Sequence, residues 1–162
     1  MIVLALGSNL PSTAGPPATT LSAALGALRQ AGIVPVAVSR FFVTPAWPDP
    51  RDPAFINAVA CVETSLTPAA LLAELHRIEE QFGRTRAVLN APRTLDLDIL
   101  DYHGRVETGP PELPHPRMAK RGFVLIPLAD VAPGWCHPVL RQNLDALIAA
   151  LPPSERNVQE LG

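Results

Sequence analysis

Two aspartates in alternating register have the types and the spacing that most clearly suggest chemistry. Leu95, Asp96, Leu97, Asp98 and Ile99 alternate apolar and acidic side chains, which is the period of a β-strand. On such a strand the apolar side chains enter a core, and the two carboxylates leave on the opposite face, roughly 7 Å apart. Carboxylates this close remain ionised together when water or a cation lies between them, and Mg²⁺ takes one or two carboxylates plus substrate phosphates. The alternative is a strand with an ordinary polar outer face.

Three arginines near this strand could supply positive charge. Arg84 and Arg86 precede it in the loop RTRAVLNAP, and Arg93 lies directly before it. Guanidinium groups suit bidentate phosphate binding, so a metal on the aspartates with a polyphosphate on the arginines is one hypothesis. The other is a set of surface salt bridges. The chain contains neither G-x-x-x-x-G-K-[ST] nor G-x-G-x-x-G, so no P-loop and no Rossmann turn is expected.

A second group of residues predicts an apolar pocket with one amide. Thr44–Trp47 belongs to the proline-rich loop TPAWPDPRDP, Phe55 and Asn57 follow in an alternating segment, and Phe123 lies in a later apolar stretch. Aromatic rings on both sides suit a flat heterocycle, and an amide both donates to and accepts from its edge. Trp47 could instead fold back onto the core, and Asn57 could bond to nearby backbone.

Length and composition limit the class of protein. With 162 residues and 48% hydrophobic residues, a single domain over 1–162 with a packed core is expected. The net charge of −2 gives no basic footprint for nucleic acid. The apolar start MIVLALGSNL reads as a first strand rather than a signal peptide, and no apolar run has the length of a membrane span. The prediction is a soluble, cytoplasmic protein, with Cys61 and Cys136 as small buried hydrophobes.

The order of the elements predicts an α+β fold. The periodicity indicates, in order, a strand at Ile2–Leu6, a helix at Pro16–Gln30, a strand at Ile33–Val43, a strand at Phe55–Thr64, a helix from Thr67 to Phe82, and the strand with the two aspartates. This β-α-β-β-α-β order is that of a ferredoxin-like sandwich. A short strand at Arg105–Glu107, a C-terminal helical extension at Leu140–Leu151 and a frayed tail after Pro153 complete the prediction.

Seven stretches of the chain share both sequence and order with one known family. They read ALGSNL at 5–10, FFVTPAW at 41–47, FINAV at 55–59, RIEEQFGRTR at 77–86, APRTLDLDIL at 91–100, LPHPRM at 113–118 and RGFVLIPL at 121–128. On these stretches the chain resembles 6-hydroxymethyl-7,8-dihydropterin pyrophosphokinase of folate biosynthesis. The resemblance implies a monomer that transfers pyrophosphate from ATP to the hydroxymethyl group of the pterin and releases AMP, without nucleic-acid or membrane partners.

The resemblance also implies roles for particular residues. Two Mg²⁺ ions are expected on Asp96 and Asp98. The implied catalytic residues are Arg84, Arg93, Asp96 and Asp98. The implied ATP-binding residues are His76, Arg84, Arg86, Arg93, Ile99, His115 and Arg121, with His76 at a place where the family usually has glutamine. The implied pterin-binding residues are Thr44, Pro45, Ala46, Trp47, Phe55, Asn57 and Phe123.

The chain departs from the family pattern around the expected nucleotide. Ala87 and approximately Asn90 stand where the family's catalytic loop commonly carries a lysine and a tryptophan, and the loop is one residue shorter. Pro116 replaces a common aromatic residue, and Pro110 lies near the place of a missing arginine. Each lost charged hydrogen bond costs about 1.5–3 kcal/mol. The alternative function is therefore a catalytically weakened protein of the same fold that binds pterin or nucleotide.

Overall fold

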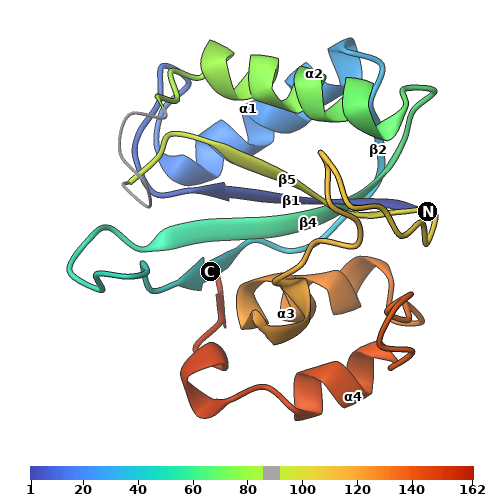
Figure 1. Ribbon diagram of the computed structural model, residues 1–162. Coiled ribbons are helices and arrows are strands. Elements are labelled where there is room, and N and C mark those ends of the chain that lie inside the picture. The colour runs from blue at the N-terminus through green and yellow to red at the C-terminus, as the bar shows by residue number, and fades with distance from the viewer. Residues whose placement is uncertain (86–91) are drawn as a thin grey trace.

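One antiparallel sheet organises the chain in the computed structural model, which describes residues 1–85 and 92–162 (Figure 1). Its strand order is β5-β1-β4-β3-β6, and β2 also pairs with β4. The strands are β1 (Ile2–Ser8), β2 (Val34–Val38), β3 (Phe42–Thr44), β4 (Phe55–Glu63), β5 (Asp96–Tyr102) and β6 (Gln159–Glu160). The helices are α1 (Pro17–Gln30), α2 (Pro68–Gln81), α3 (Gly122–Val131) and α4 (Leu144–Ala149), with short 3₁₀ turns at Met118–Lys120 and Pro153–Glu155.

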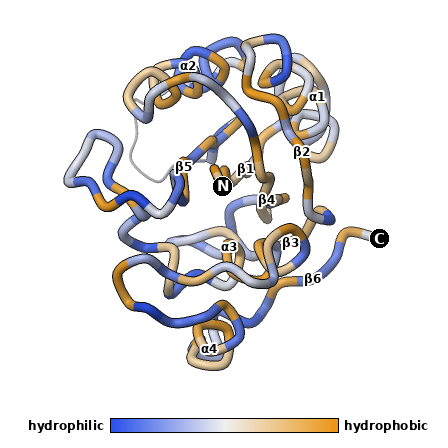
Figure 2. The backbone as a smooth tube through the Cα atoms, turned by 90° about the vertical axis from the view of Figure 1, so that its right-hand side faces the viewer, coloured by the Kyte–Doolittle hydropathy of each residue, from blue (hydrophilic) through white to orange (hydrophobic). Residues whose placement is uncertain are grey.

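Helices cover both faces of the sheet and create two cores. Figure 1 shows α1 and α2 on one side of the strands and α3 and α4 on the other. Strand β1 serves both layers, because Ile2 and Leu4 are buried with the residues of α1 and α2, whereas Val3 is buried with those of α3 and α4. Figure 2 shows hydrophobic and hydrophilic residues interleaved along the helices, as expected for helices with one buried face.

The predicted α+β sandwich is confirmed in its order of elements and in its sheet. Both helices of the β-α-β-β-α-β unit form where the apolar periodicity places them. Helix α2 begins as predicted, because the Thr67 hydroxyl accepts from the Ala70 N–H and Pro68 fills a position that needs no donor. In β5 the alternation is also confirmed: Leu97 and Ile99 are buried under α1 and α2.

The predicted strand at Ile33–Val43 is wrong as one continuous element. It divides into β2 and β3, and the β2 register with β4 shifts between Pro35 and Ala37, because proline cannot donate to the ladder. Between the two strands, Ser39 takes over the pairing with Val59. Its N–H donates to the Val59 carbonyl at 2.8 Å, and its hydroxyl accepts from the Val59 N–H at 2.9 Å.

The C-terminal part of the chain differs most from expectation. The tail after Pro153 does not fray, because β6 pairs with β3. The last helix is shorter than Leu140–Leu151, since the Asn143 side chain caps it by accepting from the Ala146 N–H at 2.8 Å. The strand expected at Arg105–Glu107 is wrong, because Glu107 forms only an isolated bridge.

The structure also bears on the expectations for the two cysteines and for membrane-spanning helices. Cys61 is buried as predicted, but Cys136 is exposed, so the prediction for that residue is wrong. Within residues 1–85 and 92–162, no helix combines the length and the apolar character needed to cross a bilayer.

Candidate active site

The two aspartates project from β5 on the side of the sheet that carries α3. Strand β5 pairs with β1, where Asp96 lies opposite Gly7 and Asp98 lies opposite Ala5. Because the even-numbered Leu100 of β5 packs in the core beneath α3 and α4, the alternation places both carboxylates on that same face. The carboxylates therefore face the elements that follow β5 in the chain.

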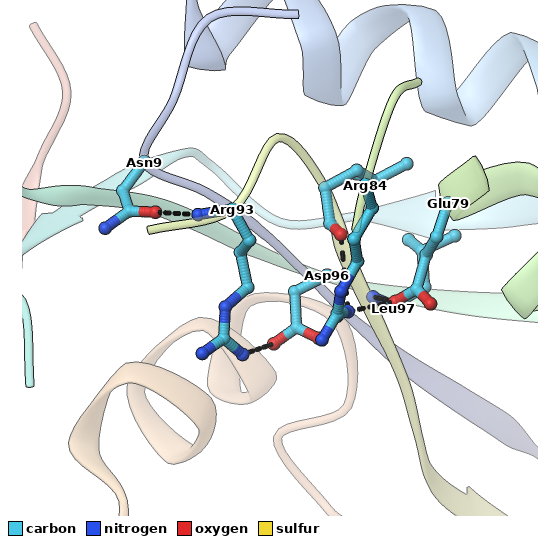
Figure 3. A network of polar contacts seen from close by, with 7 residues as sticks. Asn9, Glu79, Arg84, Arg93, Asp96 and Leu97 are labelled. Carbon is cyan, nitrogen blue, oxygen red and sulfur yellow. Dashed lines mark hydrogen bonds and ion pairs between the residues drawn. The ribbon is translucent and has the colours of Figure 1, made fainter. Parts of the chain in front are cut away.

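Asp96 lies at the centre of a network of charged groups (Figure 3). The Arg84 guanidinium donates from Nη1 to Asp96 Oδ1 at 2.6 Å and to Glu79 Oε2 at 2.6 Å. The Arg93 Nη1 donates to the other Asp96 oxygen at 3.3 Å. Both arginines therefore neutralise one carboxylate, and the chain brings together three residues that the sequence predicted for one site.

Glu79 is a member of this network that sequence reasoning missed. Only 1% of this α2 residue is exposed. Its Oε2 also accepts from the Leu97 N–H at 2.8 Å, so it ties α2 to the strand between the two aspartates. A signal was present, because Glu79 lies four residues after the buried Leu75 and so belongs to the buried face of α2. A charge at such a position requires partners.

Asn9 fixes the backbone of Arg93 and was also missed. The Asn9 side chain accepts from the Arg93 N–H at 2.7 Å and donates to the Pro53 carbonyl at 3.1 Å. The Asn9 N–H donates in turn to the Arg93 carbonyl at 3.1 Å. The Arg93 guanidinium also lies 5.8 Å from the ring centre of Phe55. Arg93 thus connects the acidic strand with the predicted aromatic pocket.

Burial and neighbouring charges perturb Asp98. Its burial, followed by the negative charges of Asp96 and Glu79, raises its pKa to about 7 against the pull of Arg121 and Arg84. An added cation would stabilise the ionised form of the Asp98 carboxyl group. In the described part of the chain, no cluster of three or more His, Cys, Asp or Glu side chains could hold a metal, so a bound Mg²⁺ needs oxygens beyond this pair. Substrate phosphates are the usual source of such oxygens.

His115 and Arg121 lie on the segment that faces the aspartates. The His115 N–H donates to the Leu100 carbonyl of β5 at 2.9 Å, which anchors the loop beside the acidic strand. Burial and then the positive charge of Arg121 lower the pKa of His115 to about 4, so the ring is neutral at pH 7. Its Nδ1 accepts from the Arg117 N–H at 3.2 Å, which leaves Nε2 as the protonated, donating nitrogen.

The predicted pocket residues lie at the ends of β3, β4 and α3. The Asn57 amide donates to the Thr44 hydroxyl at 2.7 Å, and both residues are buried. Gly7 makes room for this amide, because a Cβ at Gly7 would lie 2.8 Å from Asn57 Oδ1. At the start of α3, the Arg121 guanidinium lies 5.3 Å from the centre of the Phe123 ring.

The remaining predicted residues take varied positions. Trp47 is 66% exposed, so the expectation that it folds back onto the core is wrong. His76 is exposed on α2, Ile99 is buried in β5, and Pro45 and Ala46 directly follow β3. Arg86 lies outside the described residues, as do the departures at Ala87 and Asn90.

Comparison with known proteins shows the family of the chain. The model of the family described as 7,8-dihydro-6-hydroxymethylpterin-pyrophosphokinase (HPPK) matches residues 3–133. The chain belongs to the HPPK family. HPPK proteins named 2-amino-4-hydroxy-6-hydroxymethyldihydropteridine pyrophosphokinase are similar to it in sequence. The one from Pseudomonas aeruginosa is 40% identical over 153 residues, covering 93% of this chain and 91% of that protein. The one from Synechocystis is 40% identical over 148 residues, covering 90% and 73%.

Solved structures extend the likeness to the HPPK fold. The crystal structure of wild-type Plasmodium falciparum HPPK-DHPS superposes with a TM-score of 0.71 at 14% identity, over 98% of this chain and 47% of that chain. The A437G/K540E form with pterin and p-hydroxybenzoate gives a TM-score of 0.73 at 13% identity, over 98% and 46%. At these identities the likeness concerns the fold, and this chain spans about half the length of those bifunctional chains.

Proposed function

We propose that the protein is a Mg²⁺-dependent pyrophosphokinase that acts on ATP and 6-hydroxymethyl-7,8-dihydropterin. The observation that carries the proposal is the convergence of Arg84 and Arg93 on Asp96, beside the partly buried Asp98. A carboxylate pair with two adjacent guanidinium groups suits a metal–polyphosphate complex. In this reaction the hydroxymethyl oxygen bonds to the β-phosphorus of ATP, the bond between that phosphorus and the α–β bridging oxygen breaks, and AMP leaves. The hydroxyl proton passes to solvent.

The donor set fits magnesium. Asp96 and Asp98 would hold two Mg²⁺ ions, which neutralise the charge of the triphosphate when bound. The raised pKa of Asp98 is compatible with this fit, because burial and then the negative charges of Asp96 and Glu79 raise it, and a bound cation would offset both effects. In the metal-free protein, Arg84 and Arg93 supply the compensating charge at Asp96. The proposed role of the same guanidinium groups toward metal and nucleotide is to contact the phosphates, with Arg84 still bonded to Glu79.

The chain's own residues then divide the work of binding. Arg84 and Arg93 stabilise charge on the transferred group. The neutral His115 offers an N–H donor to the nucleotide. The remaining nucleotide contacts are assigned to His76, Arg86, Ile99 and Arg121. The pterin is assigned to a site with Phe55 and Phe123 stacked on its faces, Asn57 at its edge, and the backbone of Thr44, Pro45, Ala46 and Trp47 around it.

The organisation of the protein belongs to the same proposal. Residues 1–162 are proposed to form one domain, since β1 and β6 from opposite ends of the chain enter one sheet. ATP and the pterin are the proposed partners, with the protein acting as a monomer in the cytoplasm. A pterin- or nucleotide-binding protein with little turnover is the second candidate, favoured by Ala87 and Asn90 in place of a lysine and a tryptophan.

Release of AMP separates the two candidates. The purified protein is incubated with ATP, Mg²⁺ and the dihydropterin, and AMP is measured by chromatography. We expect release with the native chain and with the control Asp145→Ala, an exposed acidic residue of α4. Asp98→Ala should abolish release but retain pterin binding in calorimetry. If the native chain released no AMP, the proposed enzymatic activity would be refuted. Normal AMP release from Asp98→Ala would refute the assignment of Mg²⁺ to Asp98.

A further inference from the structure

After α4, the C-terminal segment passes the first residue of α3 and returns to the sheet. In Figure 1 it is the red segment that rises from α4 toward β4. The Arg156 side chain anchors its start, donating to the carbonyls of Ile148, Ala149 and Leu151 at 2.8–3.1 Å. We call residues 155–161 the C-terminal strap. The strap lies beyond residue 133, where the match to the family model ends.

At its first end the strap touches the beginning of α3. A Cβ on Gly122 would lie 1.7 Å from the Glu155 carbonyl oxygen and 3.4 Å from the Val158 side chain. A real Cβ cannot occupy that space, so backbone meets backbone here because the residue is glycine. Gly122 stands between Arg121 and Phe123, both assigned above to the site. The strap therefore fixes the position of the helix start that carries the Phe123 ring.

At its other end the strap supports β3 and the loop after it. Glu160 and Gln159 pair with Phe42 and Val43, and the Leu161 N–H donates to the Phe41 carbonyl at 2.8 Å. Beyond this pairing is a hollow of about 350 Å³. Its lining joins the strap to the loop: Asn157 and Gln159 on one side, and Val43, Thr44, Pro45, Ala46, Pro50, Asp52 and Ala54 on the other.

We propose that the C-terminal strap is a positioning segment for the heterocycle pocket, holding the Phe123 side and the Thr44–Ala46 side at a fixed separation. This inference rests on the proposed function. A ring that stacks on an aromatic side chain and bonds to a loop needs both at the correct distance, and the strap contacts both elements. The strap touches the nucleotide side of the site at one place, where Glu155 lies near the charge of Arg121, so it should affect binding of the heterocycle more than binding of the nucleotide.

Gly122→Ala tests the proposal against a matched control. Gly26→Ala adds the same methyl group in α1, where nothing lies within 4 Å of the new Cβ. Calorimetry measures binding of 6-hydroxymethyl-7,8-dihydropterin with α,β-methylene-ATP and Mg²⁺ present, and binding of that nucleotide alone. For Gly122→Ala we expect at least about a tenfold rise in the pterin Kd, equivalent to about 1.4 kcal/mol. The nucleotide Kd should rise less, because only Arg121 of the nucleotide residues adjoins Gly122. Gly26→Ala should match the native chain.

The outcomes are distinguishable. Absence of pterin binding by the native chain refutes the proposed function itself. Native pterin binding with an unchanged Kd in a folded Gly122→Ala protein overturns the role of the strap. An equal loss of pterin and nucleotide binding also overturns it, because the effect is then general.

Amide exchange in the native chain provides a test that needs no variant. If the pocket and the strap are coupled, binding at one must stabilise the other by the same factor. Pterin binding should therefore slow exchange of the Leu161 amide, which is bonded to Phe41. The His103 amide, bonded to the Met1 carbonyl, serves as the control and should keep its rate. A Leu161 rate that does not change on pterin binding would contradict the proposal even if Gly122→Ala fails to fold.

Discussion

Glu79→Gln probes the charge that holds Arg84 beside the acidic strand. Glutamine has nearly the same shape as glutamate and keeps one oxygen for the Leu97 N–H, which lies 2.8 Å from the carboxylate in the native chain. It removes the negative partner of the Arg84 guanidinium, now bonded at 2.6 Å. The substitution therefore removes one negative charge from a buried network with little change of shape.

The contacts set the size of the effect. A hydrogen bond to a charged group contributes about 1.5–3 kcal/mol. Breaking an isolated buried pair costs about 3–5 kcal/mol, but Arg84 keeps Asp96 as a partner, so the lower range applies. For a chain of this size each kcal/mol shifts Tm by about 2–4 °C, so Tm should fall by about 3–12 °C. If the same energy is lost in the transition state, kcat falls by about 10- to 150-fold.

Thermal melts and AMP release measure the two effects, with Glu80→Gln as the matched control. Glu80 is the next residue of α2 and is exposed, so its substitution should change stability by less than about 0.5 kcal/mol. Pterin affinity should be the same in both variants, because the described bonds of Glu79 are to Arg84 and to the Leu97 N–H of the acidic strand. A Glu79→Gln protein with the Tm and turnover of Glu80→Gln would show that this charge does not hold Arg84.

Three further perturbations test other parts of the site. Without metal at pH 8, Asp98→Asn should raise the Tm, since it removes a partly buried charge that lies near two other carboxylates. The same substitution should abolish the rise in Tm that Mg²⁺ with an ATP analogue gives to the native chain. His115 has a pKa near 4 when folded and about 6.5 when unfolded, so the unfolded chain takes the proton first and stability is lost as pH falls from about 6.5 toward 4. Urea unfolding of His115→Gln across this pH range should show a smaller loss of the free energy of unfolding than the native chain shows. An equal dependence on pH in both proteins would contradict the lowered pKa of His115. Gly7→Ala should weaken pterin binding in calorimetry but spare the nucleotide, because its Cβ would lie 2.8 Å from Asn57 Oδ1.

Local pattern accounts for much of the fold. The alternation around Asp96 and Asp98 defined a strand and its two faces, and Thr67 with Pro68 marked the start of α2. These features depend on backbone periods of 2 and 3.6 residues and on capping, all of which act within a few residues. The register shift inside β2 lies at Pro35, whereas the break between β2 and β3 lies at residues 39–41, where Ser39 pairs with Val59.

Family membership and the types of the site residues were also available from sequence. The run PRTLDLDIL with the later PH and RGF segments indicated the family that the comparison then matched over residues 3–133. Spacing along the chain did not reveal how those residues meet. Arg93 precedes the strand, and only the structure shows that its side chain reaches Asp96 while Asn9 anchors its backbone.

The sequence by itself determined which residues alternate, where helices begin and which family the chain resembles, because these depend on neighbours in the chain. Tertiary structure decided which partners Glu79 meets, that Trp47 is exposed and that the tail joins β3. Each of these depends on contacts between segments far apart in sequence, where burial energy and available partners outweigh local preference. A carboxylate such as Glu79 gives no local sign of its partners, since Arg84 and the Leu97 N–H reach it only after α2 packs against β5.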